Sequence, residues 1–481
     1  MNALDVAARL RAAETNTAVR LGRVASAAVE RAPYVFVGLS LAGEDATLHA
    51  VRFGRYGEAP IVDESIIDPR DRSAQYALFA TIATAFFRIC EEAKLEGTFP
   101  QIIVANESSA KHLSYLADRT LYLQDAEHAT DAERERTAMV NIFGRYLSYF
   151  TTRAPIARQQ ALLSATRLLR ATYVTGEAAS DEDNLHVLRS WIEPLPVGVD
   201  PFDYRAAAAT RPSGKQTTTD VDRELMRVLA LLRTAEKAEP PDQVAASLAR
   251  TAIRALLHET VDDIDEAVRW ALEHLGGLAL PIMAHIKEAR NAEQKAFESF
   301  MRSRDEGFHI RRHDTPRTAA IEYAYRTAEQ SIADVGAMWY DPVMRARAVL
   351  DGRVLRGKVT AVDMIAGTMT VHTVQPSLRA RVGDRFFATD QTAYTVTRAI
   401  FTDDGIDVIV NATPRIDAPQ VGDRIDLLPN VPRFDDAVRS RNQAARRLAA
   451  PHWVYDEEAI ATKGPVFTQP LDVIAELEKF A

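Results

Sequence analysis

An internal repeat from about Leu350 to Pro429 constrains the fold of this chain more than any other feature. Each copy alternates apolar and polar residues and reads as strand, turn, strand, loop, the sequence Val-Gly-Asp-Arg and a third strand. The matching segments, separated by 37, 38 and 39 residues, are Val359–Val362 and Val396–Ala399, Gly367–Val371 and Gly405–Ile409, and Val382–Arg385 and Val421–Arg424. One copy leaves open sheet edges, whereas two copies can close on each other. The repeat therefore predicts a C-terminal six-stranded β-barrel.

The Val-Gly-Asp-Arg sequence predicts a tight turn in each copy. Gly383 and Gly422 can adopt the positive φ angle that other residues disfavour. Asp384 and Asp423 follow them, and an aspartate side chain can accept hydrogen bonds from backbone donors of such a turn.

Length and composition exclude several classes of protein. The chain has 481 residues, which predicts several domains, and its single cysteine, Cys90, excludes an intramolecular disulfide framework and a multi-cysteine metal site. The formal charge of −9 indicates that any binding to phosphates depends on local basic clusters. No apolar stretch has the length of a membrane span, and the acidic residues near the N-terminus argue against a secretory signal. We expect a cytoplasmic protein with no membrane partner.

The N-terminal part, residues 1–125, alternates strands with helices. Its first thirty residues read as an amphipathic helix, and a later helix is capped by Asp71 or Ser73. The order is strand, strand, strand, helix, strand, helix, strand, which predicts an RNase H-like α/β domain. The segments are Tyr34–Leu41, Ala46–Phe53, Ile61–Ile67, Ala77–Cys90, Gln101–Ala105, Ser108–Leu116 and Thr120–Leu123.

Residues 126–345 have the 3.6-residue periodicity of a helical domain. The stretch Trp191–Asp220 is interrupted by prolines and reads as an irregular connection, and Pro240–Pro241 marks a helix boundary. The barrel then covers residues 346–430, and a helical and extended tail covers residues 431–481. The predicted helices are Asp131–Phe150, Pro155–Val174, Val221–Thr234, Val244–Glu259, Ile264–Leu275, Leu280–Arg302, Thr315–Met338 and, in the tail, Asp435–Ala450 and Leu471–Phe480. The whole chain is thus predicted to be a multidomain α+β protein.

The first predicted strand carries no carboxylate, although a two-metal nuclease of the RNase H type needs one there. Glu44 and Asp45 lie in the following turn and Glu107 follows the fourth strand, so a metal-dependent nuclease or hydrolase stays open as an alternative. Ser213–Thr217 resembles a P-loop but lacks its first glycine and a preceding apolar strand. We therefore expect neither a motor nor catalytic residues.

Other candidate chemistry has simpler explanations. His258–Asp262 resembles a zinc-protease helix without its second histidine, and His309 and His313 stand four residues apart in a basic loop. Cys90 falls on an apolar helix face, which is typical of a core residue. We expect no bound metal and no cofactor, with the His258/Asp262 helix as the second form of the hydrolase alternative.

Arginines cluster ahead of the last long helix and again just after the barrel, close to Trp339, Tyr340 and Trp453. Arginines beside aromatic rings suit the neutralisation of a nucleic-acid backbone and the stacking of bases. The other interpretation is a solvated helix face paired with Asp305, Asp435 and Asp436. The candidate nucleic-acid-binding residues are Arg302, Arg304, Arg311, Arg312, Arg439, Arg441, Arg446 and Arg447.

Two resemblances bear on function. The stretch Ile102–Glu107 with His112, Leu113 and Arg119, together with Arg353–Asp363, resembles the region upstream of the motor in bacterial superfamily 1 helicases. That resemblance implies a degenerate RNase H-like domain and a β-barrel that lies against nucleic acid, but the helicase motifs themselves are missing. The doubled Val-Gly-Asp-Arg element resembles the glycine–aspartate box of cradle-loop barrels, which serve as adaptor, substrate-binding or nucleic-acid-binding modules.

The sequence thus predicts a non-catalytic accessory subunit that binds a protein partner, such as an ATPase or helicase, together with DNA or RNA. The resemblance places it in a helicase-type antiviral defence or repair assembly. A metal-dependent nuclease or hydrolase, and a structural component of a large particle, are the alternatives.

Overall fold

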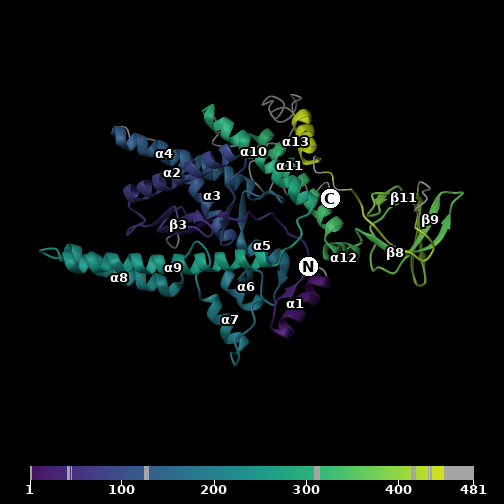
Figure 1. The fold of residues 1–481 in the computed structure, drawn as a ribbon, viewed down its shortest axis with the longest axis horizontal. Coiled ribbons are helices and arrows are strands. Elements are labelled where there is room, and N and C mark those ends of the chain that lie inside the picture. The colour runs from purple at the N-terminus through teal and green to yellow at the C-terminus, as the bar shows by residue number, and fades with distance from the viewer. Residues whose placement is uncertain are drawn as a thin grey trace, which may run out of the picture. The chain divides into compact units, whose positions relative to one another are not determined.

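The computed structural model describes residues 3–40, 44, 46–123, 129–307, 315–412, 419–431, 433 and 436–448 (Figure 1). Within these residues the protein is mixed α+β, with thirteen α-helices. The chain packs as two units, the first formed by Met1–Phe308 with Ala333–Pro432 and the second by His309–Ile332 with Arg433–Ala481. The predicted domain boundaries at residues 125, 345 and 430 stay predictions.

The first unit contains a five-stranded mixed sheet. Its order is β4-β3-β2-β5-β6, where β2, β3 and β4 are antiparallel neighbours, β5 is parallel to β2, and β6 is parallel to β5. All six residues of β2 are buried, so this strand lies inside the sheet and is covered on both faces. The strands are β2 (Tyr34–Leu39), β3 (Ala50–Arg55), β4 (Val62–Ser65), β5 (Ile102–Val104) and β6 (Leu162–Ser164). The predicted three-stranded meander is confirmed.

Helices cover both faces of this sheet because successive residues of β2 point in opposite directions. Tyr34 and Phe36 join a core with α2 (Arg72–Glu96), α3 (Glu107–Leu121) and α4 (Asp131–Arg153). Val35, Val37 and Leu39 join a second core on the other face. Its helices are α5 (Ala165–Thr172), α6 (Leu185–Ile192), α8 (Thr219–Lys237) and α9 (Gln243–Gly277).

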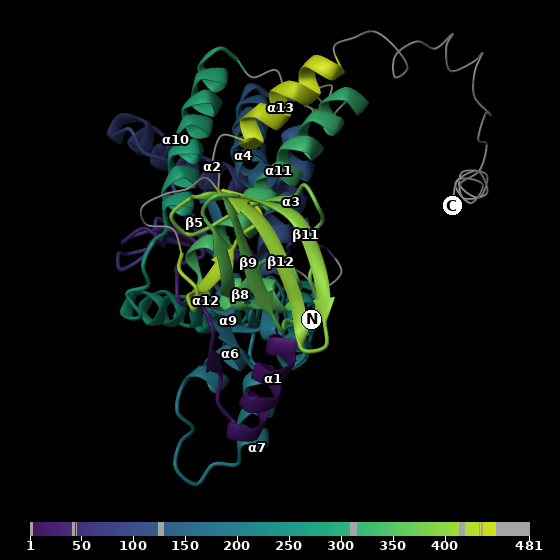
Figure 2. The same cartoon turned by 90° about the vertical axis from the view of Figure 1, so that its right-hand side faces the viewer.

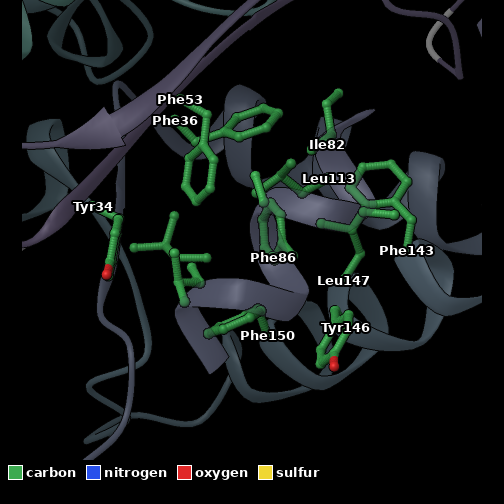
Figure 3. Close-up of a cluster of buried hydrophobic side chains, with 14 of the residues drawn as sticks. Tyr34, Phe36, Phe53, Ile82, Phe86, Leu113, Phe143, Tyr146, Leu147 and Phe150 are labelled. Carbon is green, nitrogen blue, oxygen red and sulfur yellow. The ribbon is translucent and has the colours of Figure 1, made fainter. Parts of the chain in front are cut away.

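Aromatic rings fill the first of these cores (Figure 3). Phe86 of α2 stacks on Phe53 of β3, with ring centroids 4.8 Å apart and planes 12° apart. The same ring meets the edges of Phe143 and Phe150 of α4 at 5.8 and 6.0 Å. Asp71 caps α2 as predicted, because its carboxylate accepts from the backbone N–H groups of Ser73 and Ala74. Phe86 therefore links α2, the sheet and α4.

Two strand predictions in this region are wrong. Thr120–Leu123 forms no strand, since α3 continues to Leu121 and the Thr120 hydroxyl donates to the Leu116 carbonyl. The fifth strand is β6, inside the stretch predicted as helix Pro155–Val174. The Leu162 N–H donates to the Gln159 side chain instead of to a backbone carbonyl of a helix, so this donor is satisfied without helical hydrogen bonding.

Other helix predictions need correction. The N-terminal helix is short, because α1 (Ala3–Thr15) is followed by β1 (Val19–Arg20), which pairs with β7 (Tyr173–Val174). The two helices predicted over residues 244–275 form the single α9, since no proline or glycine interrupts it and Val261 at the expected break is buried. The connection Trp191–Asp220 contains α7 (Pro201–Ala209), which begins with proline at its first position and is capped by Asp200.

Three of the remaining elements agree with predicted helices, namely α10 (Ala284–Asp305), α11 (Pro316–Tyr340) and α13 (Asp436–Arg447). The short 3₁₀ turn η1 (Asp181–Asp183) and the helix α12 (Pro342–Leu350) were not predicted, and α12 extends past the predicted start of the barrel at residue 346. α13 agrees with the predicted tail helix, whereas the predicted helix Leu471–Phe480 lies outside the described residues. None of the helices in the described part of the chain combines the length and the apolar character that a membrane crossing requires.

The C-terminal part of the first unit is a nearly closed six-stranded antiparallel barrel, as predicted from the repeat (Figure 2). The strand order is β10-β11-β12-β9-β8-β13, and the outer strands meet where Phe387 and Leu428 exchange backbone hydrogen bonds of 2.7 and 2.8 Å. The strands are β8 (Leu355–Asp363), β9 (Thr368–Thr373), β10 (Arg385–Phe387), β11 (Ala393–Thr402), β12 (Gly405–Ala412) and β13 (Arg424–Leu427). Buried valines such as Val371 and Val410 fill the interior.

The two halves of the barrel repeat each other in detail. The β8–β9 ladder shifts register between Val359 and Ala361, and the β11–β12 ladder shifts between Val396 and Arg398, 37 residues later. In the second strands, the fully buried Val371 and Val410 occupy equivalent positions 39 residues apart. The duplication therefore reaches the level of bulges and inward-facing side chains.

The separation between equivalent residues of the two halves grows from 37 to 39 because the β11–β12 hairpin is longer than the β8–β9 hairpin. β11 and β12 stay paired down to Thr402 and Gly405, whereas the β8–β9 pairing ends at Asp363 and Thr368. Gly405 is thus a paired strand residue, while Gly367 lies in a loop with φ of 62°. The predicted equivalence of these two glycines at a separation of 38 residues is wrong.

The Val-Gly-Asp-Arg element of each half binds the first strand of the other half. Gly422 N–H donates to the Val359 carbonyl at 2.8 Å, and Val359 N–H donates to the Asp423 carbonyl at 2.9 Å. In the opposite direction, Gly383 N–H donates to the Val396 carbonyl at 2.8 Å, and Val396 N–H donates to the Asp384 carbonyl at 2.9 Å. The two halves are therefore joined reciprocally.

Both Val-Gly-Asp-Arg turns have the predicted geometry. The φ angles of Gly383 and Gly422 are 91° and 102°, in the region that favours glycine. The Asp384 carboxylate accepts from the Arg381 N–H at 2.7 Å, and Asp423 accepts from the Gln420 N–H at 2.8 Å. Each aspartate thus closes its own turn.

The aromatic core yields a stability prediction. Replacing Phe86 by alanine should lower the free energy of unfolding by about 3–5 kcal/mol, because it removes a fully buried ring between two layers. The adjacent Phe87 is 46% exposed, so Phe87→Ala should cost less than about 1 kcal/mol. Urea unfolding followed by circular dichroism measures both values, and equal losses in the two variants would contradict this packing.

Candidate functional site

Four of the predicted nucleic-acid-binding arginines lie on α13 in the second unit. Arg439, Arg441, Arg446 and Arg447 are all exposed, and the helix carries a single acidic residue, Asp436, in its first turn. Arg446 and Arg447 form no ion pair within the described residues and stand in the last turn, where cations suit the helix dipole. The helix therefore presents a strongly basic end.

Contacts with α11 hold α13 in place. Arg441 forms an ion pair with Glu322 at 2.8 Å and lies over the Tyr325 ring at 5.8 Å. Near the other end of α13, Arg317 donates to the Ala445 carbonyl at 3.4 Å. Arg441 thus positions the helix, which leaves the basic end to Arg446 and Arg447.

Arg302 and Arg304, in the first unit, differ in role although they stand two residues apart on α10. Arg302 is exposed and makes no ion pair in the described part of the chain. Arg304 forms ion pairs with Glu91 and Asp305, donates to the Tyr146 hydroxyl at 3.3 Å and lies over the Phe87 ring at 5.5 Å. The Arg304 side chain therefore fastens α10 to α2 and α4.

Several sequence-predicted residues lie outside the described residues or are packed. Arg311 and Arg312 are not described, nor are His309, His313, Asp435 and Trp453. Trp339 is 7% exposed and donates to the Asn430 carbonyl, while Tyr340 stacks on His285 with ring centroids 5.5 Å apart. Among the described residues of the second unit, the Tyr323 ring on α11 is 73% exposed.

β2, the first strand of the sheet, carries no carboxylate at its centre, and its C-terminal end is covered by the chain around Lys215. The Ser40 N–H donates to the Lys215 carbonyl at 2.7 Å, and Ser40 bridges Gln216. A Cβ atom at Gly214 would lie 2.6 Å from Asn106 Nδ2 and 2.8 Å from Ser108 Oγ, so this backbone touches protein atoms. The segment that resembles a P-loop therefore serves as a cover for the sheet.

Most of the described acidic and histidine candidates lie beside a charged partner. Glu44 pairs with Arg70 at 2.6 Å, His258 lies 3.4 Å from Asp63, and Asp262 pairs with Arg52. Asp45 lies outside the described residues, and Glu107 lines a cavity considered below. In residues 3–40, 44, 46–123 and the other described ranges, no three His, Cys, Asp or Glu side chains are placed to hold a metal ion.

The structure also contains a basic cavity that the sequence did not reveal. It has a volume of about 650 Å³ and lies in the first unit beside α1, α5 and α12. Its lining includes Arg9, Arg167, Arg170, Arg347, Glu107 and Glu182. These residues come from segments more than 300 positions apart, so no local motif could have indicated the cavity.

Comparisons with known proteins identify no relative. No family model, no curated protein and no solved structure matches the chain. The resemblances to the helicase region and to cradle-loop barrels stay predictions, and the function must be inferred from this chain's own geometry.

Cys90 should be inert in the folded protein. Its side chain is fully buried in the first core, and burial raises the pKa of the thiol, so the reactive thiolate is suppressed. We expect the native chain to resist labelling by a disulfide reagent at pH 8 and to react completely in guanidinium chloride. A Ser303→Cys variant on a Cys90→Ser background supplies an exposed control. Labelling of native Cys90 at the rate of that control would contradict its place in the core.

Proposed function

We propose that the protein is a non-catalytic accessory subunit that binds single-stranded nucleic acid through the basic end of α13. The observation that carries this proposal is the pair Arg446 and Arg447, which are exposed and without an ion pair in the described part of the chain. Adjacent arginines of this kind can neutralise successive phosphates of a strand.

Charge in the second unit supports the same proposal. Over its full sequence this unit carries eleven basic and eleven acidic residues, so its positive charge is concentrated on α13, which has four arginines and one aspartate. Because the protein as a whole is acidic, a local cluster of positive charge favours binding of a polyanion at that cluster rather than over the whole surface. The exposed ring of Tyr323 in the same unit offers a surface on which a base can stack.

The first sheet supports the accessory role. Numbered along the chain, its strands lie in the order third, second, first, fourth, fifth, and only the second is antiparallel to the others. This order is typical of RNase H-like domains, and we interpret the sheet as a silent member because its first strand, β2, carries no carboxylate at the centre, where such a nuclease needs one. An ATPase or helicase partner would supply the motor, in an antiviral defence or repair assembly.

Binding of a fluorescent single-stranded DNA or RNA as a function of salt tests the proposal. The logarithm of the binding constant should fall linearly with the logarithm of salt concentration. Arg446→Ala with Arg447→Ala should weaken binding and reduce the slope by about 1.4, since each phosphate contact on a single strand contributes about 0.7. Fluorescence anisotropy on the full chain provides both values.

The matched control is Arg223→Ala with Arg227→Ala. These two exposed arginines lie on α8, four residues apart, and pair with Asp220 and Glu224. The control changes the net charge equally but should leave affinity and slope close to those of the unaltered chain. An absence of binding at low salt, a flat salt dependence, or equal losses in both double variants would refute the proposal.

A further inference from the structure

The basic cavity of the first unit combines arginines from three helices. Arg9 comes from α1, Arg167 and Arg170 come from α5, and Arg347 comes from α12 (Figure 1). The cavity does not involve α13, so the inference drawn from it is independent of the proposed nucleic-acid interface.

A buried carboxylate organises part of this cavity. Glu182 is 3% exposed and accepts from the Thr175 hydroxyl at 2.7 Å and from Arg9 Nη2 at 3.1 Å. Arg170 Nε lies 3.5 Å from the same carboxylate. Arg9 also donates through Nη1 to the Glu177 carbonyl at 2.5 Å. The Glu182 side chain thus fixes two arginines before any ligand arrives.

Donors remain in the cavity after these contacts. Arg167 makes no side-chain hydrogen bond or ion pair within the described residues, and the two terminal nitrogens of Arg170 are likewise unused there. Arg347 pairs with Asp5, yet its buried Nε has no acceptor. The exposed guanidinium groups of Arg167 and Arg170 and the buried Nε of Arg347 can therefore donate charge-assisted hydrogen bonds to an anionic ligand.

An apolar cavity of about 330 Å³ adjoins the basic one. The two share Arg170, Ala171, Tyr173, Val174 and Arg347 in their linings. The second is lined mainly by apolar side chains such as Leu21, Ile286 and Met344, with Arg158, His285, Asp334 and Asp341 at its polar parts. A ligand that fills both must carry an anionic group on a flat or apolar body. Glu107, on the basic side, offers a carboxylate that can accept from a hydroxyl group.

We propose that these adjoining cavities bind a nucleoside phosphate. The phosphate group contacts Arg167, Arg170 and Arg347, the sugar hydroxyls lie toward Glu107, and the base enters the apolar cavity. The same chemistry is offered by a free mononucleotide and by the 5′-terminal nucleotide of a strand.

Calorimetric titration of the full chain tests this site. The probes are the four 5′-ribomononucleotides, the corresponding nucleosides, inorganic phosphate, and a short DNA strand with either a 5′-phosphate or a 5′-hydroxyl. Binding of the mononucleotides but not of the nucleosides would support a free nucleotide. Binding confined to the 5′-phosphorylated strand would support the terminal nucleotide as the natural form of the ligand.

Arg167→Ala is the decisive variant because this side chain makes no contact that the described fold needs. It should weaken binding of the phosphate-bearing probe about tenfold or more, the usual effect of losing a charge-assisted hydrogen bond. Arg88→Ala, which removes an exposed arginine of α2 that lies 3.8 Å from Glu92, is the matched control and should bind as the unaltered chain does.

Four results would overturn the proposal, and the first three concern the nucleotide and the key variant. They are the absence of binding by every phosphate-bearing probe, equal affinity for nucleosides and nucleotides, and unchanged affinity in Arg167→Ala. Binding of inorganic phosphate alone, without any gain from the nucleoside, would exclude the apolar cavity and with it a nucleoside phosphate as the ligand.

Discussion

The reciprocal backbone hydrogen bonds between the two halves of the barrel are the interaction on which the C-terminal architecture depends. Gly422 and Asp423 bond to Val359 in the first half, while Gly383 and Asp384 bond to Val396 in the second. In each half, one side of the first strand has its backbone hydrogen-bond partner in the other half, so one copy alone would leave those backbone groups unpaired. Duplication of the sequence is therefore a physical requirement of this barrel.

Closure of the barrel also restricts how the protein can bind partners. The outer strands are joined at Phe387 and Leu428, so the barrel has little free edge to which a partner strand could be added. Recognition by the barrel must therefore depend on side chains. Elsewhere, the described residues gather arginines at the basic end of α13 and around the cavity beside α5.

The sequence predicted those parts of the structure whose signals are local. Alternation and the doubled Val-Gly-Asp-Arg element sufficed for the barrel, and periodicity sufficed for most helices. β6 was missed because its three residues are strand only through pairing with β5, inside a stretch of helical pattern. Arginine clustering found Arg446 and Arg447 but could not separate them from Arg304, whose acidic and aromatic partners are distant in sequence. The cavity was invisible because its residues meet only after folding.

Amide hydrogen exchange in two barrel variants tests the reciprocal connection most directly. Asp423→Ala should speed exchange at Val359 in β8, and Asp384→Ala should speed exchange at Val396 in β11, because each turn supports the first strand of the opposite half. Asp363→Ala is the control, since this carboxylate binds only the Ile365 and Ala366 N–H groups of its own hairpin. Faster exchange confined to the half that carries each substitution would contradict the interlocked barrel.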